Sequence, residues 1–335
     1  MKKISLLLLF IHLLTACTNE IGPIPKNEPR KLIISALLNA GKTENAIYLN
    51  LSDYSSPQIV KNGIIRLYIN GKLSETIDEC TWHPENEEYE NYKDYYYSVH
   101  SHFKTGDHVR IEAETRDGKF NAEAETTVYE PLRIIKMDTL RITINSSFGS
   151  EKYTRLKIKL EAPECDQTLY YRIQLKQDYV YHVFNRETQK DSLITDTFWG
   201  LRYYYDTALM DGKPGDPANH DSDMEFIPVY ENYYQVFSDA YFTNHQYTMT
   251  ADAYIYFPYW DQQNYEIRKT TCHATLQVYA ISPNEYRYLR AASAYNDNNS
   301  SSPLESPVIF PNNIKRGIGI FAIENPTEYQ FEMKR

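Results

Sequence analysis

An acidic loop in the second half of the sequence carries the residue types that calcium prefers. The loop runs from residue 211 to 225 (DGKPGDPANHDSDME). Its candidate oxygen ligands are Asp211, Asp216, Asp221 and Asp223. Their spacing does not follow an EF-hand loop, and the prolines and glycine among them are typical of an exposed connection. We therefore expect a solvated acidic loop, with calcium binding as the alternative.

Two histidines form a second candidate for metal binding. His100 and His102 lie two residues apart after a predicted strand, so their side chains can point to the same face, and Asp107 and His108 follow closely. A histidine pair without a third ligand motif is more typical of a strand surface than of a metal site. We therefore expect neither a metal nor another cofactor in this protein.

The motifs of the common enzyme classes are missing from the sequence. There is no G-x-S-x-G elbow, no H-E-x-x-H pair, no Walker loop and no G-x-G-x-x-G turn. Nothing singles out a catalytic pair of carboxylates among the 45 acidic residues. The net charge of −10 argues against a nucleic-acid partner, because such proteins concentrate Lys and Arg against phosphates. We expect a protein that is not an enzyme.

Aromatic clusters are the most suggestive surface chemistry in the chain, which contains 31 tyrosines. Consecutive residues of a strand face opposite sides of a sheet, so a Tyr triplet places at least one ring on each face. An exposed ring can bind a sugar, a peptide or a protein surface. The contact surface predicted from these clusters consists of Tyr203, Tyr204, Tyr205, Tyr259 and Trp260. The alternative is that the rings only cover a two-layer β fold, in which Tyr is common.

The first residues predict a secreted protein with a lipid anchor. Lys2 and Lys3 precede an apolar core of signal-peptide length, which closes with small residues before Cys17. The segment Leu14-Thr15-Ala16-Cys17 is a lipobox pattern, which predicts a signal peptide over 1–16 and acyl chains such as palmitate on Cys17. Residues 17–30 contain three prolines and predict a tether. We expect attachment to the outer membrane, on its periplasmic or its surface face.

Three cysteines remain after the predicted anchor. They are Cys80, Cys165 and Cys272. An odd number of thiols in an oxidising compartment allows at most one disulfide, with the pairing left open.

Strand patterns fill residues 31–130 and predict a β-sandwich of immunoglobulin or transthyretin type. Asn70-Gly71 and Asp117-Gly118 each separate two alternating segments and predict hairpins. Glu130-Pro131 ends the pattern, and residues 131–335 predict a second β-rich domain. One segment of that domain predicts a helix from Pro283 to Tyr295, with Ser282 as its N-cap.

The C-terminal end carries a distinctive turn. Gly317 and Gly319 alternate with apolar residues, which predicts a strand that packs closely against another backbone. Asn313 just before it predicts turn or capping chemistry instead of a ligand.

Several of these motifs occur in an order that resembles a known family. The lipobox is followed by an apolar strand at Leu32 to Leu38, a V-F-S-D-x-x-F segment at Val236 to Phe242, and an N-I-x-x-G-x-G-I-F turn at Asn313 to Phe321. Together they are similar to the domain of unknown function 4249 family, lipoproteins of Bacteroidetes-type bacteria. The resemblance implies an outer-membrane lipoprotein often encoded with TonB-dependent receptors, and it implies no catalytic or ligand residues.

These observations give two expectations for function. The first is a non-catalytic outer-membrane or cell-surface lipoprotein that is an accessory or binding partner of a TonB-dependent transporter. The second is a structural subunit, pilin-like or adhesin-like, in which β-sandwiches exchange strands.

Overall fold

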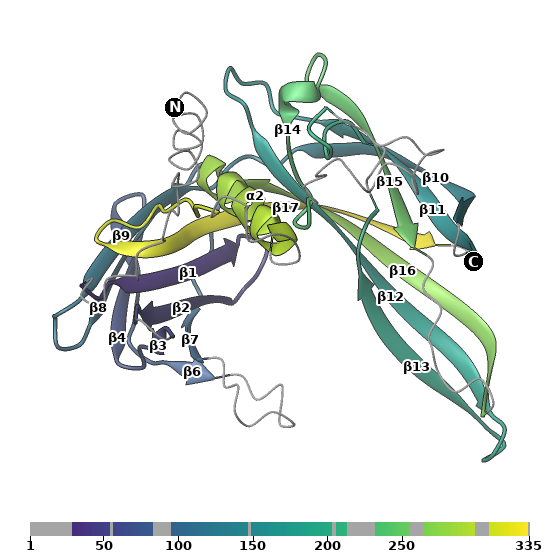
Figure 1. Cartoon of the computed structure of the whole chain (residues 1–335), viewed down its shortest axis with the longest axis horizontal. Coiled ribbons are helices and arrows are strands. Elements are labelled where there is room, and N and C mark those ends of the chain that lie inside the picture. The colour runs from purple at the N-terminus through teal and green to yellow at the C-terminus, as the bar shows by residue number, and fades with distance from the viewer. Residues whose placement is uncertain are drawn as a thin grey trace, which may run out of the picture.

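The structure, a computed structural model, describes residues 29–53, 56–82, 95–146, 149–202, 206–212, 232–254, 264–298 and 308–333. Its strands in the N-terminal half are β1 (Leu32–Asn39), β2 (Asn45–Leu51), β3 (Gln58–Ile59), β4 (Gly63–Ile69), β5 (Lys72–Ile77), β6 (Thr81–Trp82), β7 (Tyr95–Val99), β8 (His108–Thr115) and β9 (Asn121–Thr127). The later elements are β10 (Arg133–Ser146), β11 (Gly149–Glu161), β12 (Tyr170–Asn185), β13 (Lys190–Trp199), β14 (Val236–Ser238), the 3-10 helix η2 (Asp239–Tyr241), β15 (Gln246–Tyr254), β16 (Tyr265–Ile281), the α-helix α2 (Pro283–Asn298) and β17 (Gly317–Met333). The prediction of a mainly β chain with a helix in its C-terminal range is confirmed (Figure 1).

One long sheet runs through the whole molecule. Its strand order is β13-β12-β16-β17-β1-β2-β7-β6, with β14 beside β12 and β3 beside β2. The first part of β17, residues 317–324, pairs in parallel with β1. Its second part, residues 325–333, pairs antiparallel with β16. The C-terminal strand therefore completes the sheet of the N-terminal half and also belongs to the other half.

The N-terminal half is a β-sandwich. A second sheet of order β5-β4-β8-β9 covers β1, β2 and the first part of β17, and the buried side chains of both sheets form one core. Ile34 of β1, Ile111 of β8 and Phe321 of β17 are all fully buried in it. Asn70 and Gly71 both have positive φ, as the type I′ turn between β4 and β5 requires. The second predicted hairpin joins β8 to β9.

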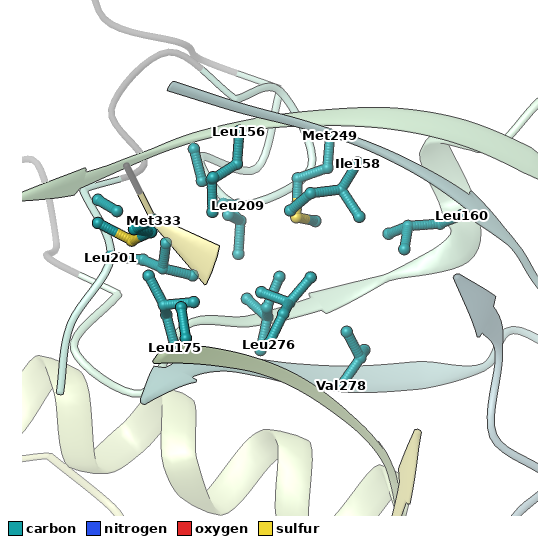
Figure 2. Close-up of a cluster of buried hydrophobic side chains, with 14 of the residues drawn as sticks. Leu156, Ile158, Leu160, Leu175, Leu201, Leu209, Met249, Leu276, Val278 and Met333 are labelled. Atoms are coloured by element: carbon teal, nitrogen blue, oxygen red, sulfur yellow. The ribbon is translucent and has the colours of Figure 1, made fainter. Parts of the chain in front are cut away.

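A second core lies between the three-stranded sheet β10-β11-β15 and the strands β12 and β16. Leu156, Ile158 and Met249 come from the small sheet and meet Leu175 and Leu276 of the large one (Figure 2). Beside this core, β13 and the parts of β12 and β16 that run alongside it form a long arm that projects from the body (Figure 1). We call residues 176–185, 190–199 and 265–275 the arm.

Helix α2 begins as the sequence predicts. The Ser282 hydroxyl accepts a hydrogen bond from the Glu285 N–H at 3.1 Å, which satisfies one of the free donors at the helix start. Leu289 and Ala292 are buried on the face that points into the fold. The helix contacts β17, β14 and β12, so it covers the large sheet near the point where β17 changes partner.

The glycines at the start of β17 have the close packing predicted for them. A Cβ atom on Gly319 would lie 2.0 Å from the carbonyl oxygen of Ile34, and its φ is +120°. The Asn313 side chain donates to the Phe321 carbonyl at 2.7 Å and accepts from the Phe321 N–H at 3.0 Å. Asn313 therefore pairs with β17 as a neighbouring strand would, which confirms its predicted structural role.

A glycine substitution tests whether this close approach holds the fold together. We expect Gly319→Ala to lower the free energy of unfolding by more than about 3 kcal/mol, because the new methyl group meets backbone and the φ is unfavourable. Gly118→Ala is the matched control, since Gly118 also has positive φ but nothing lies within 4 Å of its Cβ position. The control should lose about 1 kcal/mol. Urea unfolding of the mature chain measures both, and equal losses would contradict the prediction.

Candidate functional site

Most of the predicted contact and ligand residues lie outside the described part of the chain. These are Cys17, Tyr203, Tyr204, Tyr205, Tyr259, Trp260, Asp216, Asp221 and Asp223. Asp211 is described, and its carboxylate forms an ion pair with Arg290 of α2. That pairing joins the turn at 206–212 to the helix.

The histidine pair lies at the surface of the N-terminal sandwich. His100 and His102 are both exposed, and the His100 N–H donates to the carboxylate of Glu75. In the described ranges, no three or more His, Cys, Asp and Glu side chains are arranged to hold a metal ion. Cys80, Cys165 and Cys272 are free thiols in this structure.

The V-F-S-D-x-x-F segment forms one wall of a polar cleft of about 400 Å³. The segment provides Asp239, Ala240 and Phe242, and the opposite wall comes from the residues that precede β12. The full lining is Cys165, Asp166, Gln167, Thr168, Asp239, Ala240, Phe242, Asn244 and His245. One wall of the cleft is a recognisable sequence motif, but the opposite wall is about 70 residues away in the chain and carries no motif of its own.

Asp239 holds the two walls together. Its Oδ1 accepts a hydrogen bond from the Leu169 N–H at 3.0 Å, and its own N–H donates to the Leu169 carbonyl at 3.1 Å. Burial raises the pKa of this carboxyl group, and these contacts and the nearby His245 oppose the shift. On the other side, Asn244 and His245 both have positive φ, in the tight turn that leads into β15. The cleft is thus a rigid surface feature rich in hydrogen-bonding groups.

The chemistry of the cleft is that of polar recognition. The thiol of Cys165 donates to the Gln167 carbonyl at 3.0 Å, so its proton is directed to the backbone. The ring of Phe242, which lines the cleft, stacks on the rings of Tyr171 and Tyr247. The cleft can accept a small polar group, while the side chains of Asp239 and Cys165 are already hydrogen-bonded to the backbone.

Two buried aspartates elsewhere accept several hydrogen bonds from neighbouring segments of the fold. Asp206 accepts hydrogen bonds from the backbone N–H groups of Ala208, Leu209 and Thr250. Asp252 is buried, and its two carboxylate oxygens accept hydrogen bonds from Nε and Nη2 of Arg155, at 2.7 and 2.9 Å. Such contacts hold the two carboxyl groups in place. Both residues position loops and strands of the second core.

A third buried acid has a different environment. Glu285, in the first turn of α2, is fully buried, and no donor among the described residues reaches its carboxyl oxygens. Burial raises its pKa well above the usual range, and the charge of Glu324 on β17 raises it further. Arg172 of β12 opposes the shift and is itself paired with Glu324 at 2.7 Å. Glu285, Glu324 and Arg172 therefore form one group of interacting side chains between helix and sheet, in which burial favours the neutral form of Glu285.

These elements define a class of protein: two β-sandwiches that share one continuous sheet, with a helix over the shared strand. The chain belongs to the family described as Domain of unknown function (DUF4249), whose sequence model matches residues 19–330. This match confirms the resemblance carried by the strand at 32–38, the V-F-S-D-x-x-F segment and the closing turn. No curated protein matches the chain. Across the described residues, no helix is both long and apolar enough to cross a membrane.

The raised pKa of Glu285 predicts a pH dependence of stability. Because the folded-state pKa lies above the unfolded value of about 4.5, the unfolded chain loses this proton first as the pH rises. The contribution of Glu285 to stability is therefore greatest below pH 4.5 and declines by about 1.4 kcal/mol per pH unit until the folded-state pKa is reached. Glu285→Gln cannot titrate and should remove this decline.

Urea unfolding at pH 4.5 and pH 8 checks this prediction. The free energy of unfolding of Glu285→Gln minus that of the natural chain should be larger at pH 8 than at pH 4.5. Glu332→Gln, at an exposed position of β17, controls for the loss of one negative charge. The same stability difference at both pH values for Glu285→Gln would show that Glu285 is ionised in the fold.

Proposed function

We propose that this protein is a non-catalytic lipoprotein, attached to the outer membrane through Cys17, which binds a membrane partner through its arm. The partner we propose is a transporter of the TonB-dependent class. The observation that carries the proposal is the open strand edge of the arm, together with the apolar side chains beside it. The family membership agrees with the lipoprotein reading, since the resemblance implied attachment of this kind.

The arm offers a long backbone edge for pairing. β12 and β13 pair along ten positions, and β16 pairs with the other side of β12 as far as the tip of the arm. β13 is the last strand on this side of the described sheet, so its outward N–H and C=O groups face away from the ladder. A partner segment in extended conformation can add to such an edge through main-chain hydrogen bonds.

The side chains of β13 divide between the two faces of the sheet. Ile194 and Phe198 pack against the second core. Leu193 and Trp199 lie on the other face, and they are 63% and 50% exposed. Large apolar side chains at such exposed positions are typical anchors of protein interfaces, and Trp is the most enriched residue among them. The edge therefore combines backbone pairing with two anchors for specificity.

Membrane attachment is the part of the proposal that can be tested first. We expect Cys17→Ser to move the protein from the membrane fraction to the soluble fraction, because the cysteine thiol is the acylation site. Fractionation of cells, with labelled palmitate incorporation as a second readout, measures the change. Cys165→Ser changes an exposed thiol and is the control. Retention of Cys17→Ser in the membrane would contradict the anchor.

Partner binding is tested by site-specific photocrosslinking in native membranes. A benzoylphenylalanine at position 193 should form an adduct with an outer-membrane transporter, identified by mass spectrometry. The control is the same group at position 73, since Leu73 is 55% exposed on β5 of the other sandwich. A protein that is lipidated and crosslinks to no transporter from position 193 would contradict the proposal.

The same experiment addresses the structural-subunit alternative. An open edge strand is also what a pilin-like or adhesin-like subunit needs for strand exchange. Adducts from position 193 that contain only further copies of this chain would favour that alternative over the transporter.

A further inference from the structure

An aromatic patch lies where the segment at 309–310 contacts helix α2. The patch consists of Tyr288, Tyr295, Ile309 and Phe310. The ring of Phe310 lies 5.5 Å from that of Tyr288 and 5.7 Å from that of Tyr295, so the segment after the helix folds back onto it. Ile309 is 86% exposed and Tyr295 is 49% exposed. Ile309 is the most exposed of the large apolar side chains described in the structure.

The composition of the patch suits a particular environment. The helix buries Leu289 and Ala292 against the sheet, and Tyr288 packs against the cluster that contains Leu289. The exposed apolar surface of the patch is therefore that of Tyr295, Ile309 and Phe310. Tyrosine rings with hydroxyl groups, beside an isoleucine and a phenylalanine, are apolar on one side and polar at the edge. Such amphipathic rings are enriched where proteins meet the headgroup region of a bilayer.

The position of the patch connects it with the predicted lipid anchor. β1 begins at Leu32, directly opposite Gly317 at the start of β17. Phe310 is only seven residues before Gly317, so the patch lies within roughly 25 Å of chain from the start of β1. The tether at 17–30 can extend to about 50 Å. An acylated Cys17 and the aromatic patch can therefore reach the same leaflet.

We propose that the aromatic patch rests in the headgroup region of the membrane leaflet that holds the lipid anchor. The inference rests on the lipidation proposed above, and it adds the surface that faces the bilayer. Acyl chains provide attachment, and the patch fixes the orientation of the body. Loss of Lys2 and Lys3 with the signal peptide changes the formal charge from −10 to −12. The contact is accordingly apolar and interfacial, and it does not require anionic lipid.

Depth-dependent fluorescence quenching tests the contact. The lipidated mature chain is reconstituted in phosphatidylcholine vesicles that contain brominated acyl chains, as the natural sequence, as Ile309→Trp and as Leu73→Trp. We expect the emission added by Ile309→Trp to be quenched by at least half, and the emission added by Leu73→Trp to be unchanged. Replacing a third of the lipid with phosphatidylglycerol should not increase the quenching. Vesicle-bound protein with no quenching at position 309 would overturn the proposal.

A second measurement separates this proposal from lipidation itself. The Cys17→Ser chain lacks acyl groups, so its weak binding to phosphatidylcholine vesicles reports the patch alone. Ile309→Asp in that chain should lower the vesicle partition coefficient about tenfold, and Leu73→Asp should not change it. An equal effect of the two substitutions would overturn the patch and leave the anchor untouched. Failure of Cys17 acylation would refute the anchor, whatever this partition shows.

Two other occupants of the patch give distinct outcomes. If the patch joins two copies of the chain, sedimentation without vesicles will show a dimer that Ile309→Asp dissociates. If the tether covers the patch, hydrogen exchange at 309–310 will slow in the full mature chain relative to a chain that begins at residue 29. Either result would overturn the membrane contact.

Discussion

The parallel pairing of β1 with β17 holds the two halves of the chain in one sheet. The first part of β17 provides Phe321 and Ile323 to the N-terminal core, and its last described residue, Met333, is buried in the second core. The approach of Gly319 to the Ile34 carbonyl leaves no room for a side chain there. The arm and α2 are both positioned by this one strand, so their geometry depends on that contact.

A group of interacting polar side chains lies where the long sheet passes from one half of the molecule to the other. Glu285, Glu324 and Arg172 connect α2, β17 and β12 at the place where β17 changes its partner. Burial of charged groups gains little stability by itself. The ion pair between Arg172 and Glu324 forms only when β12 and β17 are both in place, so it favours this one arrangement, and burial under the helix favours the neutral form of Glu285.

Local sequence patterns predict the strands, turns and helix of the fold. They do not show which strands that are distant in sequence pair with each other. The Asn70-Gly71 hairpin and the helix start at Ser282 depend on residues close in sequence, so turn and capping chemistry were sufficient. The alternation of a strand shows which side is buried but does not name its neighbour, and the β1–β17 pair was therefore not predicted. The cleft around Asp239 was missed for the same reason, because Leu169 and His245 reach it from separate segments.

The position of β17 after the other described strands has a consequence for how the protein folds. Synthesis begins at the N-terminus, and the N-terminal sandwich lacks one of its strands until residues 317–324 have been made. Contacts of such sequence separation form late and slowly, so the edge of β1 must wait for its partner during synthesis. The folding of the first half of the protein is thus coupled to the synthesis of a segment far along the chain.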